Sequence, residues 1–107
     1  MEELVEADKI EVGIEADGAR TPVVKLVGEI DVSNADLVQG AIDRSIEDQR
    51  QQVAFDLSDL RFMDSSGLAV LLRVAKRVAV VELRNPAPIV RRIIQITGVS
   101  SVFVVSS

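Results

Sequence analysis

The sequence predicts a single α/β domain with a mixed, mostly parallel sheet. Segments with the alternating or short apolar pattern of strands are followed in turn by segments with helical spacing, which gives the order ββαβαβαβ. Strands that alternate with helices are joined by crossovers, and crossovers favour parallel pairing. Hydrophobic residues make up 48% of the 107 residues, which is enough for a buried core. No linker or repeat divides the chain, so we expect one domain over residues 1–107 and a sheet of about five strands.

The first two predicted strands form a hairpin. Residues 9–15 alternate polar and apolar side chains, residues 22–28 are mostly apolar, and turn residues including Gly18 lie between them. We expect the remaining elements in this order: a helix that begins at Ser33, a strand over 52–57, a helix that begins at Ser65, a strand over 78–83, a helix that begins at Pro88 and a strand over 101–105. The residues alone leave open whether the helices share one face of the sheet or flank it.

The composition excludes most hydrolases and metalloenzymes. The chain has no Cys and no His, so it lacks disulfides, thiolate ligands, the commonest metal ligand and the usual general base. It has no Trp or Tyr to stack on bases or sugars, and no dinucleotide or P-loop fingerprint. We therefore expect a protein that is not an enzyme, with no catalytic residues, no metal and no cofactor.

The charge balance argues against nucleic-acid and membrane partners. The chain has 17 acidic and 12 basic residues and a net charge of -5, which is unfavourable for binding phosphate backbones. No apolar run approaches the roughly 20 residues of a membrane helix, and the acidic N-terminus is unlike a signal peptide, so we expect a cytoplasmic protein. Residues 1–48 hold 13 acids and 4 bases, whereas residues 49–107 hold 4 acids and 8 bases. This asymmetry indicates either solvated faces of mixed sign or a polarised surface that orients a protein partner.

The segment over residues 62–68 is the strongest candidate for a functional site. Between apolar neighbours it places Asp64, Ser65, Ser66 and Gly67 in consecutive positions at the start of a predicted helix. One N-cap explains one of these polar residues and leaves the second hydroxyl and the glycine without a structural reason. A serine nucleophile needs an adjacent base, and the chain has no His. We therefore predict that Ser66 is an exposed acceptor of a phosphoryl group rather than a catalytic residue.

A second acidic residue is expected at the same end of the sheet. Asp31 follows the strand over residues 22–28, and sites in parallel α/β folds collect at the carboxyl ends of the strands. Ordinary turn chemistry also explains this segment when it is taken alone. If Asp31 and Asp64 lie together without a basic neighbour, they form a small negative patch.

Several motifs together resemble one known family. They are, in chain order, GEID at 28–31, DLS at 56–58, FMDSSGL at 62–68, NPAPIVRR at 85–92 and ITGV at 96–99. The chain resembles STAS domains, specifically the stand-alone bacterial anti-sigma-factor antagonists. Each motif alone is weak, but the ordered set covers nearly the whole chain and is specific.

The resemblance implies a fold, a function and site residues. The fold is a mixed sheet with helices packed largely on one side. The unphosphorylated form binds an anti-sigma factor that is a serine kinase, and this frees the sigma factor. The kinase then phosphorylates Ser66, the complex falls apart, and a serine phosphatase resets the cycle. The residues that match the partner surface are Asp31, Asp64, Ser65 and Gly67.

Two departures and one alternative accompany this resemblance. Only the ten residues 68–77 separate Gly67 from the next predicted strand, and the sequence has no terminal helix after residue 105. The alternative function is a STAS subunit of a larger signalling scaffold or of a lipid-transport assembly. A gene beside a kinase and a sigma factor favours the first function, and a transporter operon favours the second. Nucleotide binding or an undetected activity is a weaker third reading.

Overall fold

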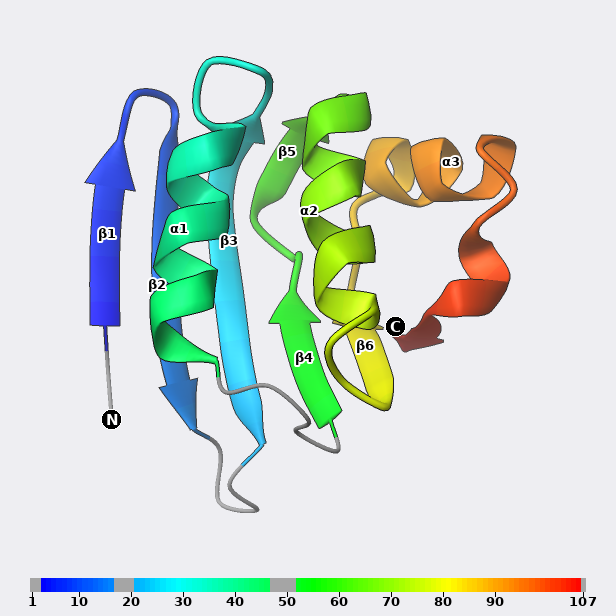
Figure 1. The fold of residues 1–107 in the computed structure, drawn as a ribbon. Coiled ribbons are helices and arrows are strands. Elements are labelled where there is room, and N and C mark those ends of the chain that lie inside the picture. Colours follow the sequence, from blue (N-terminus) through cyan, green and yellow to red (C-terminus); the bar gives the residue numbers. More distant parts are fainter. Residues whose placement is uncertain (1–2, 17–20, 47–51, 107) are drawn as a thin grey trace.

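Seven strands form one mixed sheet, in the order β1-β2-β3-β4-β6-β7, with β5 pairing to β3 beyond the end of β4 (Figure 1). The computed structural model describes residues 3–16, 21–46 and 52–106. Its elements are β1 (Glu3–Ala7), β2 (Ile10–Ala16), β3 (Pro22–Ile30), α1 (Ala35–Ser45), β4 (Gln52–Asp56), β5 (Leu60–Met63), α2 (Ser65–Ala75), β6 (Val80–Arg84), α3 (Pro88–Ile96), the 3-10 turn η1 (Ser100–Val102) and β7 (Val104–Ser106).

The sheet has an antiparallel part and a parallel part. β1, β2 and β3 pair antiparallel, whereas β3–β4, β3–β5, β4–β6 and β6–β7 pair parallel. β4 carries three consecutive buried residues, as expected for a central strand that is covered on both faces. β3 instead alternates buried with less buried side chains. β3 and β5 end side by side at the upper edge in Figure 1, where α1 and α2 begin.

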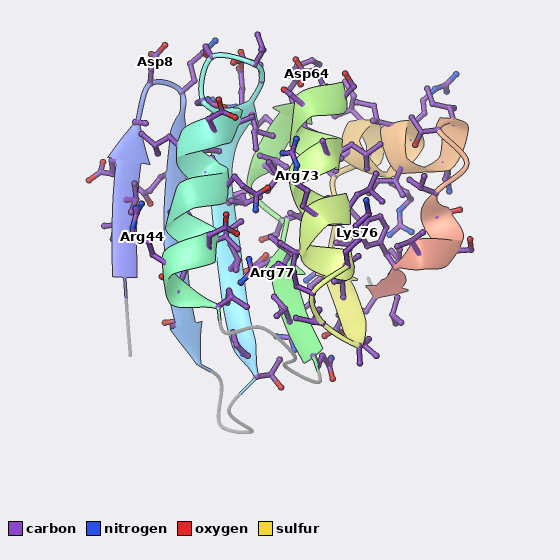
Figure 2. The ribbon with its side chains drawn as sticks, viewed as in Figure 1. Asp8, Arg44, Asp64, Arg73, Lys76 and Arg77 are labelled. Atoms are coloured by element: carbon purple, nitrogen blue, oxygen red, sulfur yellow. The ribbon has the colours of Figure 1, made fainter. Side chains whose placement is uncertain are left out.

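Two helices cover one face of the sheet. α1 and α2 lie side by side in front of the strands, and α3 lies beyond α2 and contacts β5 (Figure 1). Arg77, just after α2, donates hydrogen bonds to the Asp43 carboxylate at 2.5 Å and to the Ile46 carbonyl at 2.7 Å. Figure 2 shows Arg73 and Arg77 between the two helices, where they hold α2 against α1.

The core lies between the sheet and these helices. The largest fully buried side chains are Phe55, Leu26, Ile30, Ile42, Leu57, Leu60, Met63, Leu71, Leu83, Ile94, Val12 and Val24. They come from both ends of the chain and from every layer, so the sheet and the helices share one cluster. Their burial removes apolar surface from water, which is the main favourable term in folding.

The predicted fold class is confirmed, and the strand count is larger than expected. β1 and β5 were not predicted. β5 has the burial pattern buried-exposed-exposed-buried over four residues, which is not the alternation by which a half-buried strand is recognised. The first helix begins at Ala35 with Asn34 at its N-cap, not at Ser33. The last strand is shorter than predicted and follows a 3-10 turn.

The helices are short. α1 and α2 have 11 residues each and α3 has 9. Across the described part of the chain, none is both long and apolar enough to cross a membrane.

Candidate functional site

The two predicted acidic residues lie next to each other on neighbouring strands. Ile30 at the end of β3 pairs with Met63 at the end of β5, and the next residues along the chain are Asp31 and Asp64. The backbone N–H of Asp64 also donates to the Ile30 carbonyl at 3.2 Å. Adjacent strands lie about 4.8 Å apart, so this pairing brings both carboxylates to one edge of the sheet.

Asp64 is the N-cap of α2. Its Oδ1 accepts hydrogen bonds from the backbone N–H of Ser66 at 2.9 Å and of Gly67 at 3.4 Å. The Ser66 hydroxyl donates to the same oxygen at 2.5 Å. A side-chain oxygen that satisfies the first free N–H groups of a helix is the usual N-cap arrangement. Here the same oxygen also orients the hydroxyl that was predicted to accept a phosphoryl group.

The two serines of the motif differ in exposure. Ser65 is exposed, whereas Ser66 is half-buried and its hydroxyl is held by Asp64. The sequence predicted an exposed Ser66, and the structure makes it the less exposed of the pair. The residue as a whole is nevertheless not among the buried positions.

Gly67 lets α2 approach the sheet closely. A Cβ at this position would lie 2.6 Å from Cγ2 of Ile30 and 2.9 Å from Cβ of Met63. Both distances are below van der Waals contact, so a side chain here would force the helix away from β3 and β5. This close packing supplies the structural reason that sequence reasoning lacked. A direct contact of the buried Gly67 with a partner stays a prediction.

Asp31 has a basic neighbour, so the expectation of an unaccompanied acidic patch was wrong. The Lys9 ammonium donates to Oδ2 of Asp31 at 2.6 Å. Oδ1 of Asp31 accepts from the backbone N–H of Ser33 at 2.9 Å and from its hydroxyl at 2.5 Å. Lys9 is 22 residues away in the chain and reaches the site because the β1–β2 turn lies beside the end of β3.

Asn34 connects the three segments around Asp31. Its Oδ1 accepts from the Asp31 backbone N–H at 3.0 Å, and its Nδ2 donates to the carbonyls of Asp8 and Glu29, each at 3.0 Å. It is 3% exposed and the sole buried polar residue in the described part of the chain. Sequence reasoning did not single it out as functional. The only signal was an Asn just before a helix, which is also ordinary turn chemistry.

The environment favours the charged form of both carboxylates. The hydrogen bond from Lys9, followed by those from Ser33, lowers the pKa of Asp31 from its ordinary value of 3.8 to about 2. The hydrogen bond from the Ser66 hydroxyl is the largest cause that lowers the pKa of Asp64. The negative charge of Asp31 acts in the opposite direction on the pKa of Asp64, which indicates that the two carboxylates interact.

The pKa of Asp31 predicts an acid-dependent loss of stability. Because its pKa is lower in the folded state than in the unfolded chain, the unfolded chain binds the proton more readily. The stabilisation is therefore present above pH 3.8 and is lost as the pH falls toward about 2. In denaturant unfolding over this range, the slope of unfolding free energy against pH should be smaller in Asp31→Asn than in the wild type. Equal slopes in the variant and the wild type would contradict the ion pair between Lys9 and Asp31.

This arrangement fits a regulated binding surface better than a catalytic centre. Among the described residues, no group of three or more His, Cys, Asp or Glu side chains could hold a metal ion. A serine hydroxyl at a helix N-terminus, beside two carboxylates, can accept a phosphoryl group from another protein and change the charge of the surface by doing so. The fold and the site thus define a small α/β binding domain.

The chain belongs to the STAS domain family. The family model, described as "STAS domain", matches residues 14–107. It therefore covers β3 to β7 and the whole of residues 64–67, called the DSSG segment below. The resemblance drawn from the motifs is therefore confirmed.

Curated relatives of similar sequence carry one functional description. An anti-sigma F factor antagonist of Lysinibacillus sphaericus is 30% identical over 83 residues, which is 73% of this chain and 71% of that protein. An anti-sigma F factor antagonist of Paenibacillus polymyxa is 39% identical over 51 residues, which is 47% of this chain and 44% of that protein. The chain thus spans less than half the length of the second relative.

Solved structures share the fold. An anti-sigma factor antagonist from Mycobacterium paratuberculosis superposes with a TM-score of 0.81 at 27% identity, covering 94% of this chain and 89% of that one. The anti-sigma factor antagonist SpoIIAA in its unphosphorylated form gives a TM-score of 0.70 at 22% identity, covering 90% and 88% of the two chains. The phosphorylated form of SpoIIAA gives a TM-score of 0.60 at 21% identity, covering 90% and 91%.

Proposed function

We propose that this protein is an anti-sigma-factor antagonist that is switched by phosphorylation of Ser66. The unphosphorylated form binds an anti-sigma factor that is a serine kinase, and the sigma factor is released. Transfer of a phosphoryl group to Ser66 ends the complex, and a serine phosphatase restores the first state. The protein acts as a binding partner and not as an enzyme, in the bacterial cytoplasm where sigma factors work.

The position of the Ser66 hydroxyl is the observation that carries this proposal. It lies at the entrance of α2, oriented by Asp64, at the edge of the sheet where Asp31 also lies. The relatives' names support the antagonist function, and SpoIIAA has been solved in an unphosphorylated and a phosphorylated form.

Transfer of a phosphoryl group from ATP to Ser66 requires no catalytic group of this protein. Oγ of Ser66 forms a bond to the γ-phosphorus of ATP, the bond from that phosphorus to the bridging oxygen breaks, and ADP leaves. A base of the kinase takes the hydroxyl proton. The present site contributes the orientation of Oγ, because Asp64 accepts its hydrogen bond at 2.5 Å. Kinase catalysis depends mainly on positioning of this kind and on charge stabilisation.

The charge of phosphoserine explains why the complex falls apart. The group adds about -1.5 to -2 charge units at neutral pH, next to Asp64 and near Asp31. A partner that faces these carboxylates then meets a more negative surface, and like charges in an interface cost several kcal/mol. The helix N-terminus stabilises an anion, so the free domain tolerates the group without refolding.

The test is to locate the phosphate. The protein is incubated with ATP and a candidate anti-sigma factor kinase, and the product is analysed by mass spectrometry. We expect one phosphate on Ser66, none on the Ser66→Ala variant, and normal modification of Ser65→Ala as the matched control. Phosphate on Ser65, or undiminished modification of the Ser66→Ala variant, would refute the assignment.

A further inference from the structure

Asp31 is already occupied by a cation in the free protein. Lys9 holds Oδ2 at 2.6 Å, and Ser33 holds Oδ1 through two hydrogen bonds. The Asp31 side chain is 22% exposed and that of Lys9 is 41% exposed. A partner that uses Asp31 must therefore share Oδ2 with Lys9 or displace it, whereas the contacts to Ser33 keep Asp31 oriented in either case.

The backbone fixes Lys9 beside this site. Lys9 has a positive φ of 68°, and its carbonyl accepts from the Glu29 backbone N–H at 2.8 Å. Gly28 makes this possible, because a Cβ there would lie 2.2 Å from the Lys9 carbonyl oxygen. The β1–β2 turn is thus locked against β3 by main-chain contacts. The family match begins at residue 14, so this contribution comes from outside the matched segment.

The surroundings of Lys9 carry more acid than base. Figure 2 shows Asp8 and Asp64 at the same end of the molecule. The charged side chains at this end include the carboxylates of Asp8, Glu29, Asp31 and Asp64 and the cations of Lys9 and Arg61, of which Arg61 lies 4.0 Å from Glu29. Carboxylates in excess over cations fit a partner surface that presents basic groups.

We propose that Lys9 is an internal counter-ion of this surface, which gives up Asp31 to a basic group of the anti-sigma factor when the complex forms. The inference rests on the proposed function and names a residue that sets partner specificity. An ion pair in contact with water is weak, so a cation brought in by the partner can replace it. Lys9 then competes with every partner cation and favours the partner whose basic group binds Asp31 best.

The test compares Lys9→Gln with a matched control. Lys25→Gln removes the same charge from another exposed pair, Lys25–Asp59 at 3.2 Å, so it reports the effect of net charge alone. By isothermal titration with the purified anti-sigma factor, Lys9→Gln should bind about two- to fivefold more tightly than wild type and Lys25→Gln. Its affinity should also fall more steeply with added salt, because the interfacial pair at Asp31 then forms without the Lys9–Asp31 pair being broken in exchange.

A double-mutant cycle identifies the group through which Lys9 acts. In an Asp31→Asn background, Lys9→Gln should change affinity no more than Lys25→Gln does, because the contested carboxylate is gone. Affinity of Lys9→Gln equal to or below that of wild type, or an effect that persists with Asn at position 31, would overturn the inference. Failure of the wild type to bind would instead reject the proposed function.

Discussion

The Ser66→Asp variant is expected to bind the anti-sigma factor at least about tenfold more weakly than the wild type. A tenfold loss corresponds to about 1.4 kcal/mol, and like charges that face each other in an interface cost several kcal/mol. The new carboxylate lies beside Asp64, which caps the same helix turn by accepting hydrogen bonds from the backbone N–H groups of residues 66 and 67. The variant also loses the hydrogen bond that the hydroxyl donates.

Ser65→Asp is the matched control for this result. It adds the same charge one residue earlier, at an exposed position of the first helical turn, where the helix dipole favours an anion. Titration calorimetry should show a smaller loss of affinity for this variant. Thermal unfolding of both variants should show that the fold is intact. Equal affinity of Ser66→Asp and wild type would reject charge exclusion as the switching mechanism.

The Gly67→Ala variant is expected to be less stable than the wild type by about 1–3 kcal/mol. The added methyl group would lie 2.6 Å from Cγ2 of Ile30 and 2.9 Å from Cβ of Met63, so α2 or the ends of β3 and β5 must move. Neither contact is with the free end of a flexible side chain. The higher helix propensity of Ala offsets only about 1 kcal/mol of this cost.

Gly40→Ala in α1 separates packing from helix propensity. At Gly40 the nearest atom to an added Cβ is the terminal nitrogen of Arg44, at 3.3 Å, on an exposed and flexible side chain. This variant should be more stable than the wild type by up to about 1 kcal/mol. Denaturant unfolding measures both changes. A stabilised Gly67→Ala variant would show that α2 does not pack as closely as described.

Much of the fold could be predicted because its signals are local. Alternation over 9–15, Pro88 at the first position of α3 and an Asp before the α2 helix each act within a few residues. The two missed strands had no such signal. In β1 the apolar Leu4 is 61% exposed, so its pattern did not mark a buried face. β5 was hidden within a segment that reads as a loop.

The candidate site could be predicted in part. The DSSG segment and Asp31 were found from residue type and position, and the parallel pairing of β3 with β5 brings Asp31 and Asp64 together. Lys9 and Asn34 were missed as site residues. Their contacts join positions 22 and 26 residues apart, and such contacts leave no periodic pattern in the chain.

The sequence by itself determined that this protein is an α/β domain without the Cys and His side chains on which most hydrolases and metalloenzymes depend. It also identified Ser66 as the serine most suited to carry a phosphoryl group. Only the tertiary structure decided the charge around that serine. The antiparallel β1–β2 hairpin delivers Lys9 to Asp31, and Asn34 ties the hairpin turn to the end of β3. Strand pairing sets these distances, because hydrogen bonds between strands bring distant residues together whatever their own propensities.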